Sequence, residues 1–316
     1  MKIHHLAIPS PFPIGPNNVF LLEGDPLTLV DTGVRTRRSL KALEEGLEAL
    51  GHPLRSVERV IVTHGHQDHF GMAREIRERS GAAVWVHAWD TEWLETYDDA
   101  FPLWSQKVIA MGRKYGLPRS ITDAMEKFQE PIKKTAAPVE VERSLDDGDR
   151  FRVGDAEFRV FHTPGHCPGE IVLDAPGLGA VFSGDHVLRD VTPNPFAGVG
   201  ERGSGLGPYL ASLKRVEALD PRIAYTGHRH FIDDWKGVVR KILRHHEARK
   251  AAIRRALDDL GGRATAYEMA KRVFPRVQAG EISLALAETL GHLEVLEAEG
   301  AVETLEAGGV VLHRKA

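Results

Sequence analysis

The alternation of apolar and polar residues near the start of the chain predicts a β-hairpin. Two β-rich runs within residues 18–31 are separated by the turn sequence Glu-Gly-Asp-Pro at 23–26. The second run ends at Asp31, so this carboxylate is expected where a strand passes into a loop. Loops that follow strands are where mixed α/β proteins usually build their sites.

A helix, a strand and a second helix are predicted next. Residues 36–50 repeat leucine at three- and four-residue spacing, which is typical of a helix with one buried face. The apolar run at 57–62 predicts a buried strand, and residues 70–80 predict another helix. The segment 63–69 between them, Thr-His-Gly-His-Gln-Asp-His, is therefore expected to be a strand-to-helix loop.

The middle of the chain has a different pattern. Residues 88–135 show helical periodicity with few β-branched runs, which we interpret as a helical insertion. Aromatic side chains are concentrated there, at Trp89, Trp93, Tyr97, Phe101, Trp104, Tyr115 and Phe128. Aromatic residues at helical spacing usually fill a core, whereas an aromatic wall beside a site would suit an apolar acyl chain or a stacked base. Both interpretations stay open at this point.

Short strands return in the second half. Residues 138–185 contain β-rich runs separated by Gly, Asp and Pro turns. A glycine-rich loop at 197–207 precedes a predicted helix at 208–219. Residues 223–225 then predict a strand that runs into Thr-Gly-His-Arg-His. The strand-then-loop pattern of the first half is thus repeated.

The last part of the chain carries helix signals followed by one hairpin. The predicted helices are 241–260, 265–273 and 282–299, and the hairpin pairs 302–305 with 310–313. Three helices and a hairpin are typical of a winged-helix domain. We therefore predict a domain over residues 1–238 that carries the insertion, and a winged-helix-like domain over residues 239–316.

Composition narrows the functions. With 316 residues, 42% hydrophobic and 27% charged, and no apolar run near 18 residues, the chain is typical of a globular protein outside the membrane. A net charge of −4 argues against a protein whose main task is to neutralise a phosphate backbone. The single cysteine, Cys167, excludes an internal disulfide and a thiolate metal cluster. The N-terminal sequence shows no export or transit pattern, which predicts a cytoplasmic location.

Histidine dominates the candidate chemistry. His64, His66, Asp68 and His69 fall within six residues, a clustering that random placement would give on the order of once in several hundred chains of this composition. Imidazole and carboxylate are ligands for zinc, iron or manganese. Four candidate ligands this close predict two metal ions rather than one.

Three later strand ends supply further candidates. His166, Asp185 and His228 each follow a glycine directly at a strand-to-loop junction. Glycine has no side chain, so it lets the backbone pass close to a site. With the cluster at 64–69, these residues predict a dinuclear metal site.

These motifs resemble those of the metallo-β-lactamase superfamily. The matching stretches are VDTG with Asp31, THGHQDH with the four-residue cluster, TPGHCPG with His166, SGDH with Asp185 and TGHRH with His228. They occur in the family's order over roughly residues 1–238. The resemblance implies an α+β fold, an αββα sandwich with the metals at one edge.

The resemblance also implies a role for each candidate ligand. It implies that the first ion is held by His64, His66 and His166, the second by Asp68, His69 and His228, with Asp185 as the bridge and Asp31 orienting the ligands. True β-lactamases of this fold lack a bridging aspartate, so Asp185 argues against antibiotic hydrolysis. Flavo-diiron relatives have Glu where this chain has His66, which favours hydrolytic zinc over redox iron. Iron and manganese remain possible native metals.

The chemistry expected from such a site is hydrolysis. Two divalent ions ~3.5–4 Å apart lower the pKa of a shared water and polarise a carbonyl or phosphoryl oxygen. Our hypothesis is that the resulting hydroxide attacks an ester-like centre, with Asp68 and Asp185 holding the metals during catalysis. If residues 228–230 are extended, His230 lies on the same side as His228 and is a candidate leaving-group acid. Cys167 is more typical of a packing residue than of a nucleophile.

The substrate stays open between two classes. Chains of this shape resemble hydroxyacylglutathione hydrolases and other thioesterases, and also a subgroup with an animal mitochondrial endoribonuclease for single-stranded RNA. The sequence Tyr-Leu-x-Ser-Leu at 209–213 is similar to both. The predicted helix 282–299 holds four Glu and no Lys or Arg, which opposes nucleic-acid binding and favours a packing or homodimerisation role.

A small acyl substrate is therefore the first hypothesis and RNA the second. The basic segment 241–255 fits RNA, but a solvated helix face explains it equally well. A metal-responsive DNA-binding protein is a third hypothesis. No membrane partner is expected.

Overall fold

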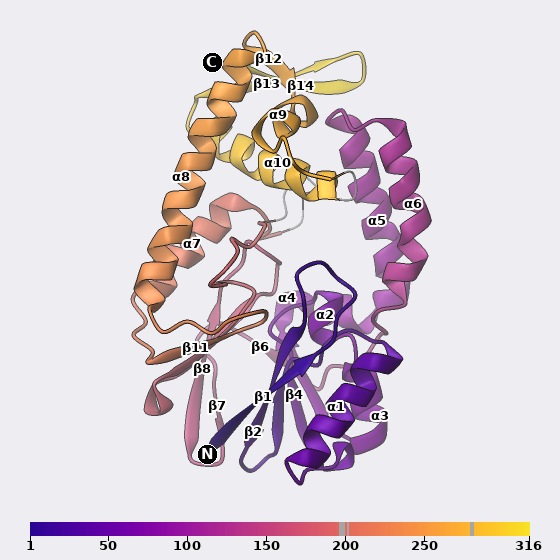
Figure 1. The fold of residues 1–316 in the computed structure, drawn as a ribbon, viewed down its shortest axis with the longest axis vertical. Coiled ribbons are helices and arrows are strands. Elements are labelled where there is room, and N and C mark those ends of the chain that lie inside the picture. The colour runs from indigo at the N-terminus through magenta and orange to yellow at the C-terminus, as the bar shows by residue number, and fades with distance from the viewer. Residues whose placement is uncertain (196–199, 201, 279–280) are drawn as a thin grey trace.

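The computed structural model describes residues 1–195, 200, 202–278 and 281–316, and two mixed sheets form its centre (Figure 1). The first sheet has the order β1 (Lys2–Ile8), β2 (Asn17–Glu23), β3 (Thr28–Val30), β4 (Arg59–Ile61), β5 (Ala83–His87) and β6 (Arg143–Leu145). The second has the order β11 (Ile223–Thr226), β10 (Ala180–Gly184), β9 (Ile171–Ala175), β8 (Ala156–His162) and β7 (Arg150–Val153). The mixed α+β fold predicted from the sequence is confirmed.

Helices cover the outer face of each sheet. Those on the first sheet include α1 (Arg37–Ala49) and α3 (Ala73–Ser80), and those on the second are α7 (Leu206–Val216) and the start of α8 (Trp235–Asp259). The alternation within β2 shows why the layers form. Val19 and Leu21 belong to the apolar cluster under the helices, whereas Phe20 and Leu22 belong to the cluster between the sheets. Strand β2 thus buries both faces, and the layers stack as helix, sheet, sheet, helix.

The predicted insertion forms three helices, of which the second and third rise along one side of the molecule (Figure 1). They are α4 (Ala88–Glu95), α5 (Tyr97–Lys114) and α6 (Arg119–Lys133). Most of its aromatic residues fill cores: Tyr97 and Phe101 are buried under the first sheet, while Trp93 and Trp104 pack against that cluster. Phe128 is 63% exposed, and Trp89 lies outside the buried clusters, against the ring of His162.

The C-terminal residues add a small third sheet at the far end of the molecule (Figure 1). Its strands are ordered β12 (Arg263–Thr265), β14 (Val310–Lys315) and β13 (Val302–Ala307), and they accompany α9 (Ala266–Val273) and α10 (Ile282–Ala298). The apolar side chains of this region pack against the insertion. Val108, Met111 and Leu117 share one buried cluster with α8, α9 and α10 residues.

Several boundaries differ from the sequence prediction. The helix predicted from residue 241 begins at Trp235, because Asp234 caps it by accepting from the Gly237 N–H and the buried Trp235 indole donates to the Val216 carbonyl. Strand β1 was not predicted. It lies at the edge of the sheet, paired with β2, and its polar residues interrupt the apolar pattern of a strand. Of the glycine-rich loop predicted at 197–207, residues 197–199 and 201 lie outside the described residues.

Among the helices that the structure describes, we find none with the length and apolar character required to cross a membrane.

Candidate metal centre

Five strands end at one edge of the sandwich, and the candidate residues follow those ends. Asp31 follows β3, His64 follows β4, His166 follows β8, Asp185 follows β10 and His228 follows β11. Strands β3 and β4 are parallel, as are β10 and β11, so their carboxyl ends meet at the same edge. The short helix α2 (Gln67–Phe70) adds Asp68 and His69 from the same loop.

Three imidazoles form the first group of this centre. His64 Nε2 lies 2.9 Å from His66 Nδ1, and His166 Nε2 lies 3.0 Å from the same atom. A tetrahedral zinc ion 2.0–2.1 Å from each nitrogen would separate the nitrogens by about 3.3 Å. The three nitrogens are therefore close enough together to bind one cation between them.

The second group contains Asp68, His69 and His228. His228 Nε2 lies 3.3 Å from Asp68 Oδ2, and His69 Nε2 lies 4.0 Å from Asp68 Oδ1. All three offer atoms within 4.8 Å of one another. A second cation would be coordinated by one carboxylate and two imidazoles.

Asp185 lies between the two groups. One carboxylate oxygen is 3.6 Å from His69 Nε2, and the other is 3.4 Å from His228 Nε2 and 3.9 Å from His166 Nε2. Gly227 makes this approach possible, since a Cβ there would lie 2.3 Å from an Asp185 oxygen. His69 Nε2 and Asp185 Oδ1 are buried without a hydrogen-bond partner. Orphaned polar atoms at such a position fit an ion that would bind both.

Three imidazoles are oriented through their other ring nitrogen. Nδ1 of His69 lies 2.8 Å from Asp31, Nδ1 of His166 lies 2.9 Å from the Asn194 carbonyl, and Nδ1 of His228 lies 3.1 Å from the Pro16 carbonyl. Such contacts fix the tautomer so that Nε2 carries the lone pair. These three imidazoles are thus arranged to coordinate through Nε2, whereas His66 directs its Nδ1 into the first group.

Asp31 is held tightly in its orienting position. It accepts hydrogen bonds from the backbone N–H of Thr63 at 2.8 Å and from the Thr63 hydroxyl at 2.9 Å, besides its contact with His69. Its own backbone is left-handed, with φ 60°, a conformation that costs energy in residues other than glycine. The three hydrogen bonds stabilise the carboxylate that the sequence placed at a strand end.

Glu170 is a buried carboxylate of the centre that sequence reasoning missed. Its Oε2 lies 3.4 Å from His64 Nδ1, and its Oε1 accepts from the Asp185 backbone N–H at 3.1 Å. Burial, reinforced by the nearby Asp185 charge, raises its pKa well above the ordinary value. Glu170 directly precedes β9 instead of following a strand, so the strand-end rule could not reveal it.

Asp90 was also missed, although a strand end marks it. It lies three residues after β5 and accepts from the backbone N–H groups of Gly65 at 2.7 Å and Gly169 at 2.8 Å. Burial raises the pKa of Asp90 to about 6. The residue ties the loop of His64 and His66 to the loop of His166.

The electrostatics divide the centre into two halves. Burial lowers the pKa of His64, His66 and His166, with His66 at about 3, so these imidazoles are neutral at pH 7. For His69 and His228 burial acts in the same direction, but the carboxylates, Asp185 foremost, overcome it and raise both pKa values, that of His228 to about 10. The field in the second half therefore favours a positive charge.

The expectation for His230 is wrong. Residues 228–230 are not extended, because Arg229 has φ 58°, and this turn directs His230 away from His228. The His230 side chain is 78% exposed and lies 3.0 Å from Asp190 on the surface. His230 therefore lies outside the cluster formed by the other candidates.

Cys167 lies beside the centre without facing it. Its thiol is buried and donates to Asp90 at 3.4 Å. Burial, with Asp90 next, raises the pKa of the thiol well above its ordinary value, so it is not a thiolate at neutral pH. The residue packs the loop, as the sequence suggested.

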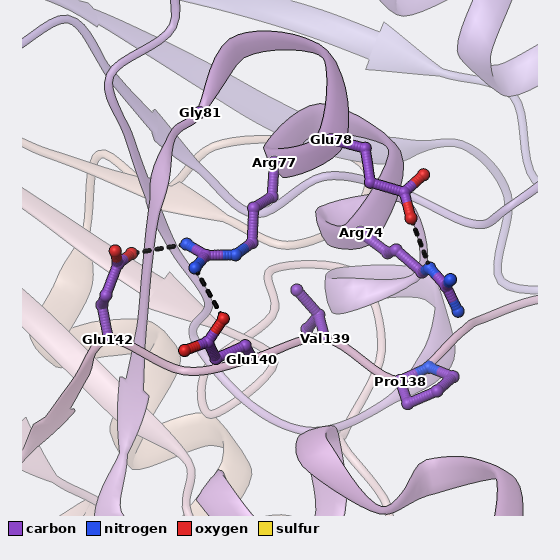
Figure 2. Close-up of a pocket in the computed structure, with 8 residues that line it drawn as sticks. All are labelled: Arg74, Arg77, Glu78, Gly81, Pro138, Val139, Glu140 and Glu142. Carbon is purple, nitrogen blue, oxygen red and sulfur yellow. Dashed lines mark hydrogen bonds and ion pairs between the residues drawn. The ribbon is translucent and has the colours of Figure 1, made fainter.

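A surface groove beside α3 is chemically unlike the centre. Figure 2 shows that its two arginines are already paired, Arg74 with Glu78 at 2.8 Å, and Arg77 with Glu140 at 2.8 Å and Glu142 at 2.6 Å. The groove presents matched charges rather than converging unpaired groups.

Comparisons with known proteins agree with this geometry. Residues 13–228 match the family described as the metallo-beta-lactamase superfamily. The chain is 30% identical over 317 residues to the probable metallo-hydrolase YqjP of Bacillus subtilis, covering 98% of this chain and 96% of that protein. It also matches the crystal structure of a metallo-beta-lactamase family protein from Thermus thermophilus with a TM-score of 0.84 and 32% identity, over 99% and 98% of the two chains. A shorter match, 28% identical and covering 44% of each chain, is to an atrochrysone carboxyl ACP thioesterase of Aspergillus fumigatus.

Proposed function

Because the chain belongs to the metallo-β-lactamase superfamily, we propose that it is a dinuclear metallohydrolase whose substrate is a thioester or ester of a small acyl group. The observation that carries this proposal is the convergence of five imidazoles and two carboxylates at one sheet edge. Two of the converging atoms are buried without partners. No protein nucleophile is needed in this proposal, and Cys167 is not offered as one.

We assign the metal-binding residues by group. His64, His66 and His166 would hold one ion, Asp68, His69 and His228 would hold the other, and Asp185 lies within reach of both groups. Nitrogen and oxygen donors suit zinc, and also iron or manganese according to supply. Two such ions, when bound, supply a hydroxide near neutral pH and polarise a carbonyl oxygen.

The protein's own residues then set the geometry and charge. Without metal, Asp68 and Asp185 are ionised, because the neighbouring histidines in their cationic forms outweigh burial and lower both pKa values. With the imidazoles neutral and bound to the ions, the cations themselves would keep the two carboxylates ionised. Their two negative charges would offset half of the charge of two divalent ions, and the remaining positive charge would favour the carbonyl oxygen of an ester group. Asp31 and Glu170 keep the imidazole rings in orientation.

The choice of an acyl substrate has three supports. The thioesterase relative carries out that class of reaction by its name, and the net charge of −4 disfavours a polyanion. The basic helix α8 is also partly neutralised, since Arg240 pairs with Glu217 at 2.6 Å and Lys250 with Glu299 at 2.7 Å. RNA stays the second candidate, because α8 carries further arginines that could contact a phosphate backbone.

We also propose that residues 239–316 form a winged-helix-like module with a packing role. Its supports are the order of α8, β12, α9, α10, β13 and β14 and the hairpin of the last two strands. Reading DNA with α10 is not proposed, because residues 289–293 are all buried, which is more than one full helical turn.

A paired assay tests the proposal. Purified protein is given a series of glutathione thioesters and, separately, a labelled single-stranded RNA, each with and without exhaustive chelation. We expect chelator-sensitive thioester turnover and no RNA cleavage. Chelator-sensitive cleavage of RNA alone would replace the acyl substrate by RNA, and turnover that survives chelation would overturn the metallohydrolase itself.

A further inference from the structure

We infer that helix α10 of the C-terminal region is a working part of the metal centre, because Asn194 connects it to His166. The backbone carbonyl of Asn194 lies 2.9 Å from His166 Nδ1, and the side-chain amide of the same residue donates to the Leu284 carbonyl at 2.9 Å. Leu284 lies in the first turn of α10. The inference rests on the proposed function, in which His166 binds the first ion.

The first step is the orientation of His166. Its Nε2 points toward His66 Nδ1 at 3.0 Å, so the proton of the neutral ring must lie on Nδ1 for Nε2 to bind a cation. The Asn194 carbonyl is the acceptor that holds this proton. Loss or displacement of that carbonyl would release the ring and allow the other tautomer.

The second step is what holds the carbonyl. Asn194 lies between β10 and α7, outside any strand or helix, and is flanked by Pro193 and Pro195, which have no backbone N–H to anchor the segment. The side-chain bond to the Leu284 carbonyl therefore anchors a segment in which both neighbours of Asn194 lack a backbone donor. Asn194 is a positioning residue that acts through His166.

The third step is the rigidity of the anchor. Ile282, Leu286 and Leu290 of α10 are buried in the cluster shared with the insertion helices and α8. The Leu284 carbonyl thus belongs to a helix fixed on several sides by apolar packing. A rigid helix fixes the amide, the amide fixes the carbonyl, and the carbonyl fixes the imidazole.

By contrast, the neighbouring imidazoles are held from within the sandwich. The contacts of His69 and His228 are to Asp31 and to the Pro16 carbonyl, which lie in the N-terminal part of the chain. The first ion therefore depends on the C-terminal region through His166, whereas the second does not depend on it in this way. The C-terminal region would control loading of one ion.

The test is Asn194→Ala in the full chain. Alanine keeps the backbone carbonyl but removes the side-chain donor to Leu284. We therefore expect roughly 10-fold weaker binding of one zinc equivalent, which lies in the range for losing a group that orients a metal ligand. Zinc affinity is measured for both equivalents by competition with a chromophoric chelator. His166→Ala marks the complete loss of that equivalent.

A matched control disturbs α10 elsewhere. Glu299 lies at the opposite end of α10, where its carboxylate is 2.7 Å from Lys250 Nζ. Glu299→Gln weakens this ion pair and is expected to leave both zinc affinities unchanged. Equal weakening by Glu299→Gln, or two wild-type affinities in Asn194→Ala, would overturn the inference. If Asn194→Ala fails to fold, nitrogen NMR of the metal-free wild-type protein locates the ring proton of His166. The inference expects this proton on Nδ1, and a proton on Nε2 would contradict the inference. Wild-type protein that binds neither zinc nor iron nor manganese would instead refute the proposed function.

Discussion

The metal centre and a buried histidine pair in the C-terminal region differ in the groups that surround their imidazoles. In the metal centre, imidazoles lie within 4 Å of Asp31, Asp68 and Asp185. In the C-terminal region, His246 of α8 and His292 of α10 face each other at 3.1 Å, and His292 Nδ1 lies 2.6 Å from the Glu288 carbonyl in its own helix. In the metal centre, several ring nitrogens and carboxylate oxygens converge where a cation could bind. In the C-terminal pair, the ring nitrogens contact each other and a helix carbonyl.

The consequences for charge are opposite. Burial, with the neighbouring His292 next, lowers the pKa of His246 to about 3, and burial lowers that of His292 to about 4. His228 is also buried but has carboxylates beside it, and its pKa is raised to about 10. Burial therefore disfavours charge on an imidazole, and only at His69 and His228 do the surrounding carboxylates outweigh it. Histidine content does not by itself make a cation site.

The largest expected effect comes from removing both kinds of ligand from the metal centre. The double variant His66→Ala/Asp68→Ala deletes one donor of each metal group, so we expect loss of both zinc equivalents and at least a roughly 10³-fold fall in turnover of the thioester. Metal content is measured by elemental analysis after dialysis, beside the activity assay. The double variant His246→Gln/His292→Gln is the matched control and is expected to keep both zinc ions. Full activity in the first variant would contradict the comparison.

A smaller effect is expected when only the orienting carboxylate is changed. Asp31→Asn keeps the size of the side chain but removes the charge that faces His69 Nδ1 at 2.8 Å. Zinc affinity should fall about 10- to 100-fold, as for loss of an outer partner, with the fold retained. Competition titration measures the affinity and circular dichroism checks the fold. Unaltered affinity for both ions would show that carboxylates do not distinguish the metal centre from the histidine pair.

The smallest effect concerns the pair of His246 and His292, where burial outweighs the nearby Glu288 carboxylate. The folded-state pKa values of about 3 and about 4 lie below the unfolded value near 6.5, so between about pH 4 and 6.5 the unfolded chain binds more protons. The free energy of unfolding should therefore fall as pH falls through this window, with each histidine contributing a slope of up to about 1.4 kcal/mol per pH unit. Above pH 6.5 the pair should have no such effect.

Urea unfolding at pH 7, 6 and 5 measures this slope. His292→Gln should flatten it relative to wild-type protein, and the surface variant His230→Gln should leave it unchanged. An equal slope in wild-type protein and His292→Gln would show that the pair is not the source.

Much of the centre could be read from the sequence because its parts follow one rule. The cluster at 64–69 is local, and His166, Asp185 and His228 each follow a strand end, so parallel neighbours bring them to one edge. The helices and strands were largely predictable for the same reason, since their apolar spacing reflects which face is buried.

What escaped prediction depends on single contacts between distant residues. Glu170 has no flanking motif, and the contact of Asn194 with Leu284 joins positions 90 residues apart. His230 was misplaced because Arg229 has a left-handed backbone conformation that changes the direction of the chain. Arginine is not a residue type that predicts such a conformation. Amphipathic spacing likewise predicted the insertion helices and the C-terminal helices, but did not say that they pack against each other.

That shared packing limits how the chain can be divided. Val108, Met111 and Leu117 of the insertion are buried by side chains that come after residue 250. A chain shortened at residue 238 would leave them in water, where apolar surface promotes aggregation. In evolution the two segments would have to change together, so neither could be transferred as an independent cassette to another protein.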